Sequence, residues 1–382
     1  MNRRQILAAG AAAVAFPPFA ARAGLRTRWS VRLSEGFDAI CFLNPLSGDP
    51  FYADYYSAEL AAFKPKLKPA TIATIGKWFA LARSKGMLLG PNLCTLMSGA
   101  PDAIIADLLT ALAEPETRLR PNFEKSPYWD VEEWTVFLTM CADLIAIFAD
   151  MRDAGFGAFR EGYLSNRTSK PSALRAKLAG IDTIAEQERL LGRKFADPSL
   201  EIVLLCFSQP HGIKIQGQRF LTHIDYPDRI VLRNADHEML HPPFPMDGAL
   251  SLALQATLKA DPLIARIVAE HDPSFGYNSF DGVLDEDTVQ ALEQIVNERL
   301  GVAEPPAQRW TESDGGMHVL AAGLYGLLKA DGYDRTGGNI ERWMNDALNS
   351  GRLAPASLHA AAARVLERPV DKLWPVPKAQ AQ

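Results

Sequence analysis

The stretch His237-Glu238-Met239-Leu240-His241 places two histidines four residues apart, with a glutamate directly after the first. On a helix, residues i and i+4 lie on one face, so both imidazoles can reach a single metal ion. Zinc accepts neutral imidazole and keeps one position open for water in catalytic sites. Glu238 can then accept the proton of that water as general base. The stretch therefore predicts a zinc site with His237 and His241 as ligands and Glu238 as a catalytic residue.

The residues around this stretch indicate how it is supported. Residues 230–232, Ile-Val-Leu, predict a strand, and Asn234 or Asp236 is a suitable cap for a helix that follows. Pro242 and Pro243 predict the end of that helix. Upstream, residues 202–207 predict a buried strand and residues 213–224 a hairpin.

A short β region, an HExxH helix and further helices follow one another here, and this order resembles the catalytic region of the zincin metallopeptidases. The resemblance covers about residues 201–300, and its sharp motif is five residues long. It implies a third protein ligand. In the gluzincin group this ligand is a glutamate on a downstream helix, and Glu286, in the predicted helix 284–300, fits that form. Asp287 beside it is then expected to accept a hydrogen bond from a ligand histidine.

Other acids remain as alternatives for the third ligand. In the metzincin group the ligand lies six residues after the second histidine, which is Asp247 here, but Phe244 stands where that group has a glycine. Glu293, Asp281 and Glu270 are further alternatives. For the donor that stabilises a tetrahedral oxyanion, residue type suggests Tyr277, His211 and His318, and we select Tyr277 because it lies in a loop just before the Glu286 helix.

The hydrophobic pattern predicts an α+β fold that is mostly helical, with a small mixed sheet and the HExxH helix in a zincin-like catalytic region. Helices are expected over residues 71–85, 101–113, 131–151 and 172–191, and again over 249–259, 263–270, 284–300, 318–329, 340–347 and 355–366. The expected organisation is a helical region over residues 24–195, the catalytic region over 196–370, and a loose tail over 371–382.

The N-terminal residues resemble a twin-arginine export signal. Arg3-Arg4 precedes a weakly apolar run, and Ala21-Arg22-Ala23 supplies a cleavage site. An ordinary secretory signal is the alternative. A signal over residues 1–23 implies the twin-arginine machinery as a partner and a periplasmic or secreted location. No later apolar run is long and uninterrupted enough to suggest stable membrane insertion.

Composition and charge restrict the function further. With 48% hydrophobic and 22% charged residues, the chain has a globular composition. Removal of the signal takes away three arginines and moves the formal charge from −5 to −8, which argues against nucleic acid as a partner. The four cysteines lack metal-site spacing, and Cys41 and Cys206 lie in apolar runs that predict buried free thiols.

These observations predict an exported zinc hydrolase that cleaves a peptide or protein substrate with zinc-activated water. A zinc hydrolase of non-peptide amides is a second reading. A non-catalytic periplasmic protein that binds a metal or a partner is a third. Glu238 favours catalysis, because metal binding alone does not require it.

Overall fold

The computed structural model describes residues 24–126, 129–275 and 277–376. The predicted signal, residues 1–23, lies outside the described residues, as do residues 377–382 of the predicted tail. Within the described part, helices predominate and the strands form one four-stranded mixed sheet. The prediction of a mostly helical α+β fold is therefore confirmed.

The chain divides into two compact units, and each unit is assembled from separate segments. Arg28–Ala179 and Ser199–Ala235 form a unit that contains the sheet, here called the sheet unit. Gly180–Pro198 and Asp236–Gln382, with the residues before Arg28, form the other, here called the helical unit. One division falls between Pro198 and Ser199, close to the expected boundary at residue 195, and others fall after Ala179 and after Ala235.

The sheet runs in the order β1-β2-β4-β3. Its strands are β1 (Arg28–Leu33), β2 (Ser199–Leu205), β3 (Ile213–Ile215) and β4 (Arg219–His223). β1, β2 and β4 are parallel, and β3 and β4 form the predicted antiparallel hairpin. β2 lies between two neighbours and is apolar and mostly buried, as parallel strands covered on both faces are. β1 was not predicted, although its six residues alternate polar and apolar as a half-buried strand does.

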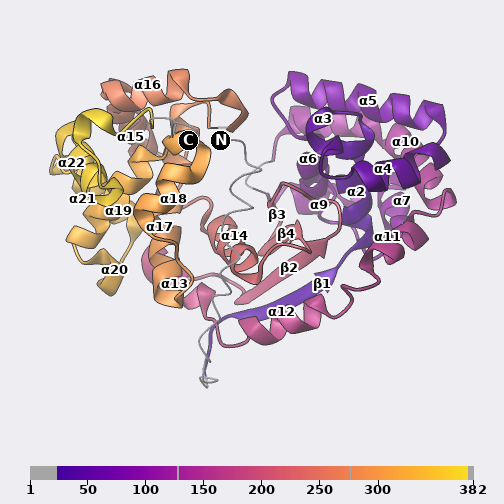
Figure 1. Ribbon diagram of the computed structural model, residues 1–382, viewed down its shortest axis with the longest axis horizontal. Coiled ribbons are helices and arrows are strands. Elements are labelled where there is room, and N and C mark those ends of the chain that lie inside the picture. Colours follow the sequence, from indigo (N-terminus) through magenta and orange to yellow (C-terminus); the bar gives the residue numbers. More distant parts are fainter. Residues whose placement is uncertain (1–23, 127–128, 276, 377–382) are drawn as a thin grey trace, which may run out of the picture. The chain divides into compact units, whose positions relative to one another are not determined.

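The sheet unit carries helices on both sides of the sheet, with α2 above and α12 below it in Figure 1. Phenylalanine rings form a cluster in this unit, in which Phe42 of α2 and Phe207, two residues after β2, lie 4.6 Å apart, centroid to centroid. The helices are α2 (Glu35–Leu46), α3 (Pro50–Ala53), α4 (Ser57–Phe63), η1 (Lys64–Lys66), α5 (Pro69–Ser84), α6 (Leu89–Leu96), α7 (Ile105–Ala113), α8 (Pro115–Arg118), α9 (Arg120–Phe123), α10 (Val131–Asp153), α11 (Phe156–Leu164) and α12 (Lys170–Leu178).

Helix α10 is long and apolar enough to cross a membrane by length and composition. The sequence predicts this apolar helix over residues 131–151, and a buried core helix passes the same test of length and composition. Half of its most apolar window is buried, and its neighbours in the sheet unit include α5 and α7.

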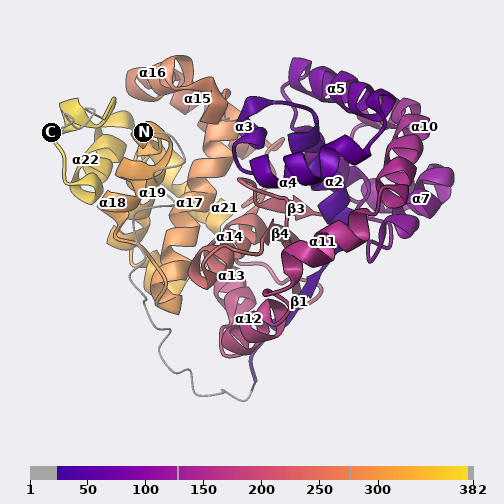
Figure 2. The same ribbon diagram turned by 45° about the vertical axis from the view of Figure 1, so that its right-hand side comes forward.

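The helical unit is built around α17 (Phe280–Leu300), which packs against α13, α15 and α19. The Ser279 side chain caps α17, and Gly301 ends it in a left-handed conformation with φ 74°. The other helices are α13 (Thr183–Leu191), α15 (Ala249–Ala260), α16 (Pro262–Glu270), η2 (Pro273–Phe275), α18 (Pro306–Glu312), η3 (Ser313–Gly316), α19 (Val319–Ala330), α20 (Tyr333–Thr336), α21 (Ile340–Asn349), α22 (Pro355–Leu366) and η4 (Val370–Lys372). Figure 2 shows these helices from a second direction.

The segment before the HExxH motif differs from its prediction. Residues 230–232 are not a strand but part of helix α14 (Asp228–Leu240), which therefore begins before the predicted caps. Buried residues recur along it at Val231, Ala235 and Met239, which is the spacing of one helical face. The helical spacing of buried residues along the whole segment therefore outweighs the strand propensity of the short Ile-Val-Leu run. The helix ends at Leu240, ahead of the two prolines, as predicted.

Two further predictions need revision. The expected single helix over residues 172–191 is two helices, α12 and α13, interrupted around Gly180. The predicted loose tail is packed at its start, since Leu373 and Trp374 are buried. The free state of all four cysteines, each of them buried, agrees with the expectation for Cys41 and Cys206.

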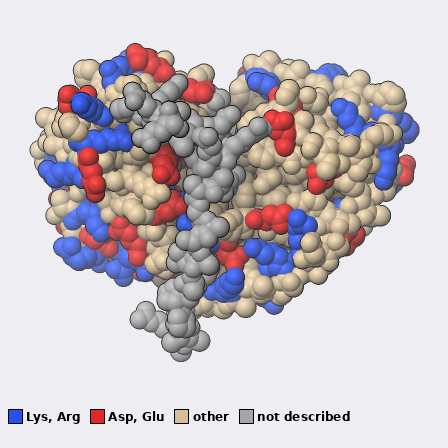
Figure 3. All heavy atoms as spheres, in the orientation of Figure 1, with Lys and Arg blue, Asp and Glu red and all other residues tan. Residues whose placement is uncertain are grey.

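Charged side chains are spread over the face of the molecule drawn in Figure 3. Acidic and basic side chains are mixed there in small groups, and uncharged surface lies between these groups. The negative formal charge of the chain is therefore not gathered into a single patch on this face.

Candidate metal centre

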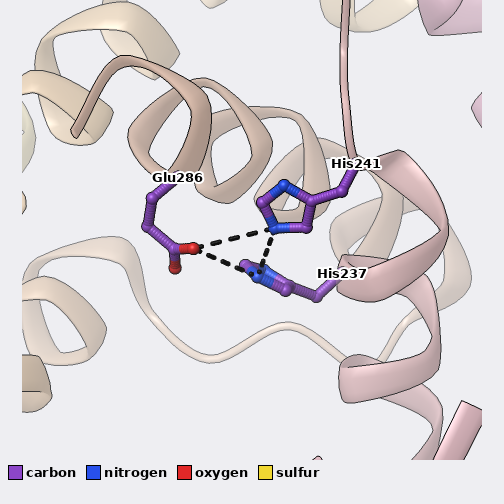
Figure 4. A group of neighbouring side chains, drawn as sticks. All are labelled: His237, His241 and Glu286. Atoms are coloured by element: carbon purple, nitrogen blue, oxygen red, sulfur yellow. Dashed lines mark hydrogen bonds and ion pairs between the residues drawn. The ribbon is translucent and has the colours of Figure 1, made fainter. Parts of the chain in front are cut away.

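His237 lies in the last turn of α14 and His241 directly follows the helix, and their rings turn toward each other (Figure 4). The Nε2 atoms of His237 and His241 are 3.1 Å apart. Their side chains are 18% and 14% exposed, so the pair is shielded but reachable from solvent. The helical spacing of four residues has brought both imidazoles to one point, as the sequence predicted.

Glu286 of α17 points its carboxylate at this histidine pair (Figure 4). Its Oε2 lies 3.5 Å from Nε2 of His237 and 3.7 Å from Nε2 of His241. Among the described residues, these three make the group of histidine and acidic ligands that could hold a metal ion. The alternatives Asp247, Asp281, Glu270 and Glu293 are not members of that group.

The spacing of the three atoms can be compared with what zinc requires. A tetrahedral zinc ion with bonds of about 2.0–2.2 Å holds its ligand atoms about 3.3–3.6 Å apart. The observed separations of 3.1, 3.5 and 3.7 Å bracket that range. Two imidazole nitrogens and one carboxylate oxygen are also a donor set of catalytic zinc sites. The residues therefore fit a zinc ion in both chemistry and spacing.

Each of the two histidines is held at its other ring nitrogen by a carboxylate. Nδ1 of His237 lies 3.0 Å from Oε2 of Glu293, and Nδ1 of His241 lies 3.1 Å from Oδ2 of Asp285. A carboxylate at Nδ1 favours the tautomer with the proton there, which leaves the Nε2 lone pair free for a metal. With both rings neutral, the two Nε2 lone pairs and the Glu286 oxygen face one another, and a cation, either a metal ion or a proton, would satisfy them.

The remaining oxygens of these acids are also engaged. Glu293 accepts hydrogen bonds from Asn297, at 2.9 Å, and from the buried guanidinium of Arg309. Oε1 of Glu286 accepts a hydrogen bond from Gln290 at 2.8 Å, and Gln290 accepts one from Trp310. Because Oε1 of Glu286 is occupied, its Oε2 is the atom that faces the histidines. The carboxylate orientation is thus set by neighbours within α17 and α18.

The acidic surroundings act on the protonation of the histidines. Burial opposes a charge on His237, but the carboxylates of Glu286 and Glu293 outweigh it and raise the pKa of His237 well above its usual value. Burial would raise the pKa of Glu286, but the neighbouring His237 imidazole holds that pKa below its usual range. A site that attracts a proton this strongly attracts a metal cation for the same reason, and the two compete.

Asp287 does not hold a ligand histidine, contrary to prediction. Its Oδ1 lies 2.6 Å from Nδ1 of His318, and its Oδ2 accepts a hydrogen bond from the backbone of Ala321. Nε2 of His318 lies 3.1 Å from Oδ2 of Asp314. Burial of His318 works against its charge, yet Asp287 and Asp314 raise its pKa to about 10. The two carboxylates therefore favour the protonated form of the buried His318.

The other predicted residues have separate positions. Tyr277 precedes α17 with a φ of 61°, unusual for a bulky residue, and its ring lies 5.9 Å from that of His318. Glu238 is a half-buried residue of α14, next to His237. His211 belongs to the sheet unit, where its Nε2 lies 2.8 Å from the Tyr52 hydroxyl.

Sequence reasoning missed Asp285 and Glu293 as supports of the histidines. A partial signal was present for Glu293, because it follows Glu286 by seven residues and so shares its face of the helix. Asp285 had no such signal. The chain gives no match to a protein family, a characterised protein or a solved structure. The functional inference therefore rests on the geometry of its own residues.

Proposed function

We propose that this chain is an exported zinc hydrolase, a metallopeptidase of the gluzincin kind, that cleaves peptide or protein substrates. The observation that carries the proposal is the convergence of Nε2 of His237, Nε2 of His241 and Oε2 of Glu286. Partners in the protein hold the other polar atom of each side chain, so that these three atoms point toward one another.

The roles of the residues follow from this arrangement. His237, His241 and Glu286 would hold the metal, with Asp285 and Glu293 fixing the two rings. Zinc, when bound, lowers the pKa of water and polarises a carbonyl group. Glu238 would accept a proton from the attacking water and pass it to the leaving nitrogen, which is the role that separates a hydrolase from a protein that only stores metal.

We assign stabilisation of the developing oxyanion to Tyr277. Both ring nitrogens of His318 face carboxylates, which leaves that residue no donor for a substrate. His318 instead supports the loop on which Tyr277 lies, through the contact of the two rings. The positive φ of Tyr277 also agrees with a functional position, since strained residues gather at such sites.

The zincin-like identity and the location belong to the same proposal. Along the chain, strands precede the HExxH helix and the helix with the third ligand follows it, which is the zincin order. The Arg3-Arg4 signal supports export through the twin-arginine machinery into the periplasm or beyond.

The test begins with metal content. Elemental analysis of the purified chain, reconstituted with zinc, should find about one zinc per chain, and the double change His237→Ala and His241→Ala should remove it. Zinc-free protein after reconstitution would end the proposal.

Glu238→Gln then tests catalysis. The amide has the shape of the acid but cannot take the proton, so activity on a broad peptide library should fall by at least about 100-fold while zinc is retained. Glu270→Gln is the matched control, because Glu270 is an exposed glutamate of the same unit outside the metal-binding group. Wild-type protein that holds zinc and cleaves nothing would indicate a non-catalytic binding protein.

A further inference from the structure

A second candidate site lies in the sheet unit, in a pocket between α5, α6 and α10. Its volume is about 290 Å³, at the small end of the range of about 300–1,000 Å³ that ligand pockets span. Each of the three helices contributes a large apolar side chain to the wall, Trp78 from α5, Leu93 from α6 and Phe137 from α10. The pocket can therefore hold a single ring or a short alkyl chain.

The wall combines fixed and adaptable groups. Trp78 is fixed by a hydrogen bond of 2.9 Å from its Nε1 to Asp143. Met87 and Met140 also line the pocket, and their flexible thioether chains can adjust to the shape of a ligand. The Lys77 ammonium lies over the Trp78 ring, 4.2 Å from its centroid, so Trp78 and Phe137 serve the pocket as apolar wall.

The polar part of the lining is acidic. Asp130, Glu132 and Glu133, at the beginning of α10, face a single lysine, Lys85, so these four side chains carry a net charge of −2. Asp130 caps α10 through the backbone nitrogen of Glu133, and Glu133 accepts a hydrogen bond from Asn92. Within the described chain, the exposed Glu132 carboxylate makes no hydrogen bond or ion pair and is available to a ligand.

We propose that this pocket binds a small organic amine. The apolar body of the ligand lies between the three helices, and its ammonium group lies at the carboxylates of Glu132 and Glu133. Charge decides the class of ligand: a carboxylate of the same size would meet three like charges and one opposite charge. The pocket shares no residue with the metal centre, so a test of amine binding is independent of the proposed zinc site.

Binding is measured with three probes that share one framework: 2-phenylethylamine, 2-phenylethanol and 3-phenylpropanoate. Titrations followed by saturation-transfer NMR should give a Kd on the order of a millimolar for the amine. The alcohol should bind about threefold more weakly, and the carboxylate more weakly still. Added salt should weaken binding of the amine and leave binding of the alcohol unchanged. Equal binding of amine and alcohol, preference for the carboxylate, or no saturable binding of any probe would overturn the proposal.

Variants assign the binding to this pocket. Glu132→Gln should weaken binding of the amine about threefold and leave binding of the alcohol unchanged. Glu59→Gln is the matched control, a partly exposed glutamate of the same unit outside the pocket, and should change the binding of neither probe. Val136→Trp fills the pocket from α10 and should weaken binding of both the amine and the alcohol by at least about tenfold. If Val136→Trp does not fold, Glu132→Gln decides, and amine binding unchanged by it contradicts the proposal.

Discussion

Replacement of Asp285 tests whether the carboxylates behind the histidines tune the metal site. Asp285 lies on α17 beside the proposed ligand Glu286, but its own contact is with Nδ1 of His241, at 3.1 Å. Without it, the His241 ring loses both the acceptor that selects its tautomer and a negative charge near the metal. We expect Asp285→Ala to lower zinc affinity without touching a direct ligand.

The expected size follows from the exposure of this contact. Loss of a carboxylate behind a ligand histidine costs about 10–100-fold in metal affinity, or about 1.4–2.8 kcal/mol. The Asp285 side chain is 30% exposed, so water can replace part of the hydrogen bond, and the low end applies. We therefore expect about a tenfold loss for Asp285→Ala. Asp285→Asn keeps an acceptor oxygen and loses only the charge, so its loss should be smaller, about threefold.

The assay is a zinc titration in competition with a chelating dye. His241→Ala sets the scale for loss of a direct ligand, and Asp281→Ala, an exposed acid in the first turn of the same helix, controls for general charge. Thermal unfolding of each metal-free variant shows that the fold is retained. If Asp285→Ala binds zinc as tightly as Asp281→Ala, the proposed role of Asp285 is wrong.

Three other predictions follow from the same structure and sequence. Glu286→Ala should weaken zinc binding to an extent similar to His237→Ala, while Asp247→Ala leaves it unchanged; the reverse result, by the same titration, would make Asp247 the third ligand. The folded pKa of His318 is about 10 against 6.5 in the unfolded chain, so its contribution to stability is complete below pH 6.5 and is lost as pH rises through 10. The free energy of unfolding should therefore fall by about 3–5 kcal/mol more between pH 6 and pH 10 in the wild type than in His318→Gln, and parallel denaturant-derived curves would refute this. Replacement of both Arg3 and Arg4 by lysine should retain the protein in the cytoplasm, measured by cell fractionation, because export by the twin-arginine route depends on the arginine pair; unchanged export would indicate the general secretory route.

Local patterns in the sequence accounted for much of the fold. Most helices of the helical unit lie close to their predicted ranges, because their apolar stripes extend over several turns. The hairpin of β3 and β4 was also readable, since a turn separates two short apolar runs. Short elements were harder to predict from the sequence. Residues 230–232 look like a strand in isolation but are helical, whereas β1 was missed although its six residues alternate polar and apolar.

At the metal centre, too, the local sequence determines some features and tertiary packing determines others. The spacing of His237 and His241 is a local property of one helix, so the sequence alone determined that these imidazoles share a face. The acids of α17 are different, because Asp285, Glu286 and Asp287 are consecutive and their side chains point about 100° apart around the helix. Only the packing of α17 against α13, α15 and α19 sets its rotation. That rotation brings Glu286 to the histidine pair and turns Asp287 toward His318, which no pattern within the helix could decide.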